Sequence, residues 1–135
     1  MPDLLFDEQY SDSSVRFTVS LDADLVVRVA FHGKGTNPGT DAFVDKMTRC
    51  VEIARGRSGK LKGSIDLSNL RGAPMMAQLT LTRWIVGVRD ALGRFAIVGS
   101  GRVERAIAKA VAKAARADNV LFTEDAAEAE RFITA

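Results

Sequence analysis

The segment VGSGRVER at residues 98–105 is the stretch of this chain most typical of phosphate binding. It indicates a strand that passes through a Gly-x-Gly turn into a helix, and the N–H groups at such a helix start can bind an anion. The dinucleotide fingerprint requires a third glycine where this chain has Glu104, and no Gly-Lys-Ser/Thr phosphate loop occurs. We therefore favour a tight turn and keep anion binding as the weaker interpretation. The candidate anion-binding residues are Gly99, Ser100, Gly101 and Arg102.

Residues that could catalyse a reaction are few and scattered. His32 is the only histidine and Cys50 the only cysteine, so the chain cannot supply the four Cys or His ligands of a structural zinc site. No Gly-x-Ser-x-Gly motif occurs, and Cys50 falls within the apolar stripe of a predicted helix. Asp66 ends a predicted strand, where a lone carboxylate usually accepts hydrogen bonds from the next N–H groups. We expect no enzymatic activity, no metal and no cofactor.

Composition indicates one globular domain outside the membrane. The chain has 135 residues, of which 47% are hydrophobic and 27% are charged. Its N-terminus is acidic and resembles neither a secretory signal nor a transit peptide, and no apolar run reaches the roughly 18 residues of a membrane span. One cysteine allows no internal disulfide. These features predict a cytoplasmic protein, and they leave self-association into a homo-oligomer open.

Charge is distributed unevenly along the chain. Residues 46–116 hold fifteen Lys or Arg against four Asp or Glu, although the net charge of the whole chain is only +2. Within the predicted helix 102–116, basic residues recur three or four positions apart and line one side. We interpret this side as a solvated helix face. The alternative is contact with anionic lipid or nucleic acid, but no aromatic residues interleave to stack bases, which argues against nucleic acid.

The alternation of turns and apolar residues predicts an α/β fold. The expected order is β-β-α-β-α-β-α-β-α, with an antiparallel hairpin at the start and a mostly parallel sheet after it. We assign residues 1–14 to an N-terminal arm that frays or docks, and residues 15–135 to a single domain. The predicted strands are 15–20, 25–32, 60–67, 94–100 and 119–122, and the predicted helices are 40–56, 75–92, 102–116 and 123–135.

The helix predicted for residues 75–92 is apolar over most of its circumference. Met75, Met76 and Trp84 contribute more apolar surface than one contact with a sheet requires. Methionine adapts its shape to what it touches, so this surface could cover a partner protein or an apolar ligand. The alternative is deeper burial beneath the N-terminal arm. Both interpretations remain open at the level of sequence.

Three segments carry a resemblance to a known family. IDLSNL at 65–70 follows the opening hairpin, and RFAIVGS at 94–100 and NVLFTEDAAEAERFI at 119–133 complete the pattern. With this order of elements, the chain resembles the STAS domain of bacterial anti-sigma-factor antagonists. The wider superfamily also resembles the lipid-binding lobe of Sec14-type proteins. The likeness spans roughly residues 15–134 in element order.

The resemblance implies a regulatory module that binds another protein. In that family a kinase phosphorylates a hydroxyl residue in the turn that opens the second helix, but residues 71–76 of this chain contain no hydroxyl. We therefore expect Ser68 to turn and cap the chain and not to carry a phosphate. The alternative function is a carrier or sensor of a lipid or other apolar small molecule. The predicted partner or ligand surface comprises Asp66, Ser68, Asn69, Arg71, Met75, Met76 and Trp84.

Overall fold

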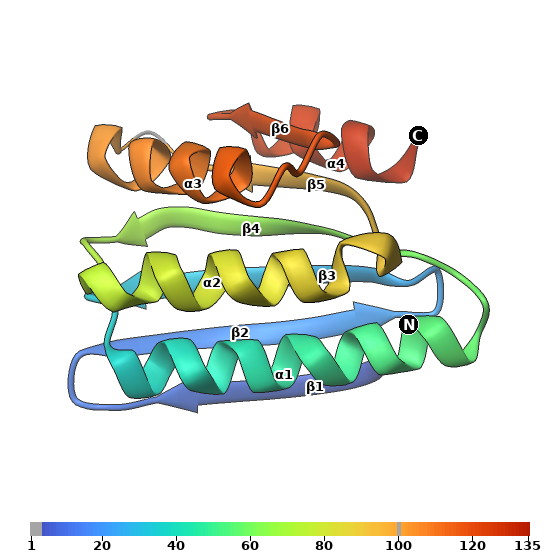
Figure 1. Cartoon of the computed structure of the whole chain (residues 1–135), viewed down its shortest axis with the longest axis horizontal. Coiled ribbons are helices and arrows are strands. Elements are labelled where there is room, and N and C mark those ends of the chain that lie inside the picture. The colour runs from blue at the N-terminus through green and yellow to red at the C-terminus, as the bar shows by residue number, and fades with distance from the viewer. Residues whose placement is uncertain (1–3, 100) are drawn as a thin grey trace.

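A computed structural model describes residues 4–99 and 101–135, with the backbone alone for residues 103 and 104. Six strands form one sheet in chain order, from β1 to β6 (Figure 1). The strands are β1 (Leu4–Ser11), β2 (Val15–Asp22), β3 (Val26–Gly33), β4 (Leu61–Leu70), β5 (Leu92–Val98) and β6 (Val120–Thr123). The helices are α1 (Asn37–Gly56), α2 (Met75–Val88), the short 3₁₀ helix η1 (Arg89–Ala91), α3 (Arg102–Ala114) and α4 (Ala126–Thr134).

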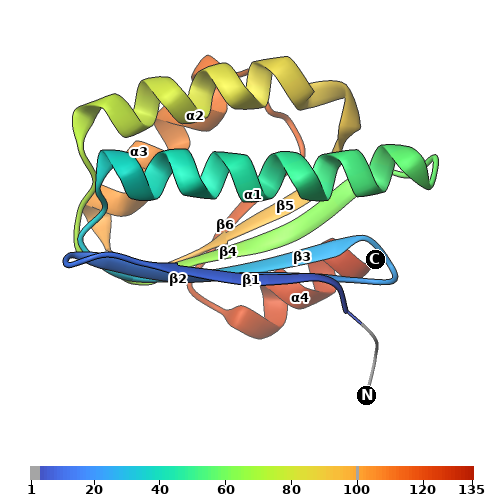
Figure 2. The ribbon, with the colours of Figure 1, turned by 90° about the horizontal axis from the view of Figure 1, so that it is seen from below.

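The topology confirms the predicted fold class. β1, β2 and β3 pair antiparallel, whereas β3, β4, β5 and β6 pair parallel. Helices α1, α2 and α3 cover one face of the sheet, and α4 lies on the opposite face (Figure 2). Each parallel connection contains a helix, as adjacent parallel strands require.

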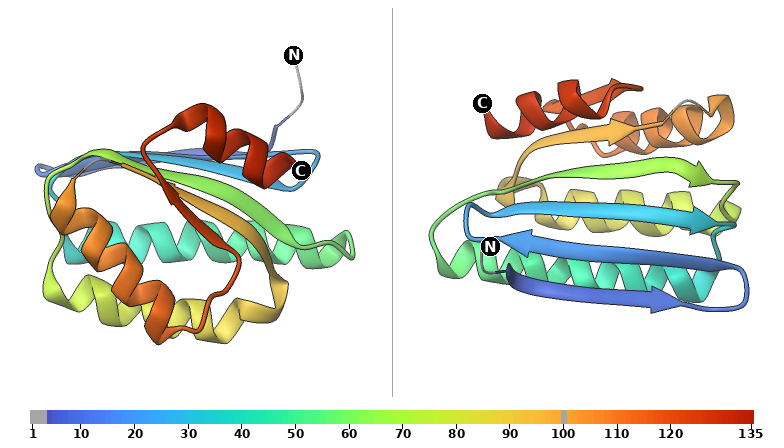
Figure 3. Two further views of the ribbon diagram at one scale, coloured as in Figure 1. Left: turned by 90° about the horizontal axis from the view of Figure 1, so that it is seen from above. Right: turned by 180° about the vertical axis from the view of Figure 1, so that it is seen from behind.

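The strand β1 was not predicted from the sequence. Residues 1–14 were assigned to an arm, but Leu4–Ser11 pair with β2 at the edge of the sheet (Figure 3). β1 alternates poorly between apolar and polar residues, so its sequence alone carries little strand signal. It lies beside α1, where Glu8 accepts hydrogen bonds from Lys46 at 2.9 Å and Arg49 at 3.2 Å. The segment therefore packs along α1 and forms no cover over α2.

The turn between β1 and β2 is anchored by Asp12. Its Oδ1 accepts the N–H groups of Ser14 at 2.8 Å and Val15 at 2.9 Å. Its Oδ2 accepts the hydroxyl of Thr36 at 2.6 Å, while the Thr36 Oγ1 accepts the N–H of Gly39 and thereby caps α1. The hydrogen bonds from the Thr36 hydroxyl and from the N–H groups of Val15 and Ser14 hold the pKa of the Asp12 carboxyl well below its usual range.

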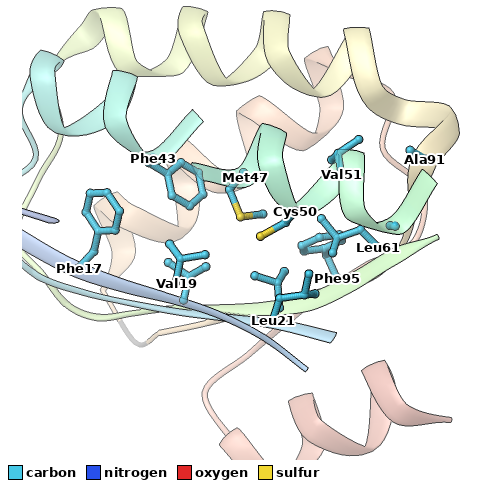
Figure 4. Packing of buried hydrophobic residues seen from close by; sticks show 13 residues of the cluster. Phe17, Val19, Leu21, Phe43, Met47, Cys50, Val51, Leu61, Ala91 and Phe95 are labelled. Atoms are coloured by element: carbon cyan, nitrogen blue, oxygen red, sulfur yellow. The ribbon is translucent and has the colours of Figure 1, made fainter. Parts of the chain in front are cut away.

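The main core lies between α1 and the first strands of the sheet (Figure 4). Phe17, Val19 and Leu21 alternate along β2 and point to α1, as their period of two predicts. Residues three or four positions apart on α1 meet them, among them Met47 and Cys50, both fully buried. The prediction that Cys50 belongs to the core is confirmed, and burial raises the pKa of its thiol to about 12.

A second, smaller core holds α4 against the other face of the sheet. Ile133 and Ala129 are buried there against Val26, Ala96 and Val98. The carboxyl end of the chain thus closes the face that α1, α2 and α3 leave uncovered. Parallel sheets normally need cover on both faces, and α4 supplies it here.

Candidate functional site

The strand β4 continues three residues further than its sequence suggests. We predicted that it ends at residue 67, but the ladder with β3 pairs Asn69 with His32 and Leu70 with Gly33. Ser68 therefore lies in the strand, which corrects its assignment to a loop. The polar residues Ser68 and Asn69 are typical of a turn, but the backbone hydrogen bonds that pair this segment with β3 do not depend on side-chain polarity.

Asp66 has the structural role that the sequence predicted for it. Its Oδ1 accepts the backbone N–H of Ser68 at 2.9 Å. This bond occurs where the β3–β4 register shifts, after the pairing of Ala30 with Asp66. A carboxylate that accepts an N–H two residues ahead stabilises such an irregularity locally.

The carboxyl ends of β3 and β4 together form a shallow polar depression. Ser68, Asn69 and Arg71, three of the predicted surface residues, line it with His32 and Gly33. Asn69, Ser68 and Arg71 are exposed, and His32 is half-buried. His32 was not among the predicted site residues. Its position at the carboxyl end of a strand was the available signal, because open α/β sheets bind ligands at that edge.

Two backbone hydrogen bonds join the loops that follow β3 and β4. The Arg71 N–H donates to the Gly33 carbonyl, and the Gly35 N–H donates to the Gly72 carbonyl, both at 2.8 Å. Gly72 has a φ of +130°, a conformation that side-chain-bearing residues rarely adopt. The loop is thereby held so that Pro74 and the first turn of α2 begin next to the polar depression.

The outer side of α2 carries an unusual concentration of exposed apolar side chains. Five large hydrophobic residues are exposed in the described chain, and four of them lie on α2. They are Met75 (85% exposed), Met76 (54%), Leu79 (42%) and Val86 (48%), which we call the α2 strip. Residues 75, 79 and 86 share one side of a helix with 3.6 residues per turn.

Trp84 does not belong to this exposed surface, and its assignment to a partner or ligand surface stays a prediction. It lies on the inner side of α2, half-buried against the main core. Its Nε1 donates a hydrogen bond to the Oγ1 of Thr48 on α1 at 2.9 Å. Trp84 therefore ties α2 to α1, while Met75 and Met76 face away from the body of the protein.

A cavity of about 360 Å³ lies beneath the inner side of α2. The inward-facing residues of the sheet that line it, Ile65, Leu67 and Ile97, are only half-buried although they occupy central strands. On the helix side the lining is also mostly apolar and includes Leu81, Trp84, Ile85, Ile107, Ala108 and Val111. Sequence periodicity identifies which residues face inward but not whether they meet, so no sequence signal indicated this cavity.

The predicted anion site lies at the end of the neighbouring strand β5. Gly99 approaches the backbone of Leu67 and Ser68, so this segment adjoins the polar depression. The Gly99 N–H donates to the Thr123 carbonyl at 3.1 Å and is not free to bind an anion. Gly101 and exposed Arg102 begin α3, whereas Ser100 lies outside the described residues. Anion binding here stays a prediction.

Metal-binding clusters and membrane-spanning helices are both absent from the described residues. No group of three or more His, Cys, Asp or Glu side chains is arranged to hold a metal ion in residues 4–99 and 101–135. In the same part of the chain, no helix combines the length and apolar character needed to cross a bilayer.

The arrangement of strands and helices defines the class of the domain: it has a STAS-like fold. No protein-family model and no curated protein matches the sequence. The solved structures that match the fold include the following two. One is an uncharacterised protein of the DUF3478 family with a SpoIIAA-like fold from Shewanella loihica, at a TM-score of 0.62 and 18% identity over 92% of this chain and 98% of the other. The second is an anti-sigma factor antagonist from Mycobacterium paratuberculosis, at a TM-score of 0.60 and 15% identity over 93% and 98%.

Proposed function

We propose that this chain is a non-enzymatic module that binds a partner protein through the α2 strip and the adjoining polar depression. The observation that carries the proposal is the exposure of Met75, Met76, Leu79 and Val86 on one short helix. A helix that is apolar around its whole circumference is normally buried, and here one side already packs inward. Burying the other side requires a second molecule.

The charges around the strip indicate the chemistry of that molecule. Arg83 is the only charged residue of α2, and exposed Arg71 precedes the helix in the polar depression. A partner with an apolar centre and an acidic rim would complement this surface. One solved protein of the same fold is named an anti-sigma factor antagonist, which is consistent with a protein as the partner.

Photo-crosslinking tests the proposal in the organism's own lysate. A photoreactive residue replaces Met76 in one variant and exposed Glu128 of α4, on the opposite face, in the control. We expect one discrete adduct from position 76, absent from position 128, with an apolar and acidic segment of the partner at the crosslink. Leu79→Asp should abolish the adduct. Adducts of equal yield from both positions, or an adduct only with a second copy of this chain, would contradict a dedicated partner protein.

The cavity supports a second function, the binding of an apolar small molecule. Its volume of about 360 Å³ falls in the usual range of small-molecule sites, roughly 300–1,000 Å³. Most of its lining is apolar, and it opens to solvent at an end lined by exposed charged side chains. An apolar occupant would remove that apolar lining from water, which is favourable by about 25 cal/mol per Å².

Native mass spectrometry of the gently purified protein tests this second function. We expect a co-purifying apolar molecule that organic extraction removes. Phenylalanine at Ala108, which lines the cavity, should exclude the molecule, whereas phenylalanine at exposed Ala106 on the same helix should not. An equal amount bound to both variants would place the molecule elsewhere on the protein.

A further inference from the structure

The charged residues that line the cavity are gathered at one of its ends. The cavity is bounded along α2 and the start of η1, from Ala77 to Arg89, which corresponds to about 18 Å of helix. Near the start of α2 the polar lining residues are uncharged, among them Thr36, Thr40 and Gln78. The charged lining residues are Lys60, Arg89, Arg116 and Asp118.

These four residues come from segments that meet at the amino ends of the parallel strands. Lys60 precedes β4, and Arg89 lies in η1, which leads into β5. Arg116 and Asp118 belong to the loop between α3 and β6. The Arg89 guanidinium donates to the Ala115 carbonyl at 2.9 Å, which places it directly beside the segment that contains Arg116. A Cβ built on Gly93 would lie 3.7 Å from that of Lys60, so the Lys60 stem borders the start of β5.

We infer that the cavity binds an anionic amphiphile, with the apolar body under α2 and the acidic head group at the end formed by Lys60, Arg89 and Arg116. This inference rests on the apolar ligand site proposed above and adds the chemistry and direction of its ligand. Three cations face one carboxylate at this end, and the rest of the described lining is uncharged. A neutral apolar molecule would gain nothing from the net positive charge at this end of the cavity. An anionic head group is attracted to this end and to no other part of the lining.

The cations at this end have donors left for a ligand. Arg89 uses one N–H group on Ala115, and a guanidinium has five. Among the ion pairs of the described side chains, none involves Lys60, Arg89 or Arg116. All three side chains are exposed at the rim, so a carboxylate or phosphate can meet them without losing all of its water.

Trp84 provides a direct readout, because it is the only tryptophan and lines the cavity. The ligand-free protein is titrated with dodecanoate and with dodecanol while its emission is recorded. Lys60→Gln and Arg116→Asn remove charges at the proposed head-group end. Asn is chosen at position 116 because the residue has a φ of +55°, which Asn tolerates. Arg16→Gln, an exposed arginine of β2 outside the lining, is the matched control.

We expect saturable binding of dodecanoate, and weaker binding of dodecanol. Each of the two variants should weaken dodecanoate binding by roughly threefold, because exposed ion pairs contribute little individually. The affinity for dodecanol, and both affinities of the Arg16→Gln variant, should not change. If dodecanoate and dodecanol bind with equal affinity and Lys60→Gln changes neither affinity, the inferred head-group chemistry is overturned while the apolar site remains supported. Binding of neither probe would overturn the apolar site itself.

Discussion

Replacing Ala108 by phenylalanine tests whether the space beneath α2 is a real cavity. Ala108 lies on the inner side of α3, and its side chain lines the cavity together with those of Ile65 and Ile97. In a filled interior the extra ring would cost about 1–3 kcal/mol through overpacking. In an existing cavity it gains apolar burial instead, so the sign of the change in stability decides between the two.

The expected gain follows from the area that the ring removes from water. Full burial of a phenylalanine side chain is worth about 1.5–3 kcal/mol. Phenylalanine has a lower helix propensity than alanine, which reduces the expected gain in the free energy of unfolding by roughly 0.5 kcal/mol. We therefore expect the free energy of unfolding to rise by about 1–2.5 kcal/mol. For a chain of this length that gain corresponds to a rise in Tm of roughly 4–9 °C.

The assay is thermal and urea unfolding of protein refolded from denaturant, so that no bound molecule contributes. Ala106→Phe is the matched control, because position 106 lies on the same helix but is exposed. The control should be neutral or slightly less stable than the wild type. A loss of stability in Ala108→Phe that exceeds the loss in Ala106→Phe would refute the cavity and, with it, both ligand proposals.

Three further predictions concern the core, the hairpin turn and the α2 strip. Cys50 should not react with iodoacetamide at pH 8 until the protein is unfolded, because burial raises the pKa of its thiol to about 12, and rapid labelling of native protein would contradict this burial. The Asp12 carboxyl has a lowered pKa in the folded protein, so it stabilises the fold above the unfolded pKa of about 4, and this contribution is lost as the pH falls from there toward the lowered folded pKa. Asp12→Ala should therefore lower the Tm at pH 7 and flatten the decline of the Tm between pH 4 and 2. Met47→Ala should cost about 2–5 kcal/mol in urea unfolding because Met47 is fully buried, whereas Met76→Ser should change stability by less than about 0.5 kcal/mol; similar losses would show that the strip is covered.

Local patterns predicted the element types that recur in the structure. Val15, Phe17 and Val19 alternate in β2, and Met47 and Cys50 follow the helical period of α1, so the faces they bury could be assigned before any fold was known. β1 was not predicted because its sequence, LLFDEQYS, lacks a clear apolar–polar period. It is a strand because β2 offers it a free edge.

The candidate site was predictable in part. Ser68, Asn69 and Arg71 were assigned from their position after an apolar strand, but only the pairing of β3 with β4 places His32 beside them. Met75, Met76 and Trp84 looked equivalent in sequence. The rotation of α2 about its axis separates them, because it exposes the two methionines and turns the indole of Trp84 to Thr48.

The sequence by itself determined the periods of its helices and strands, their order along the chain, and the excess of apolar side chains on α2. Those features depend on residues a few positions apart, which share one backbone geometry. The tertiary structure alone decided how far α2 and α3 stand from the sheet, and hence that Lys60, Arg89 and Arg116 border one cavity. Such contacts join residues that are distant in the chain, and they depend on how side chains of different elements fill the space between them.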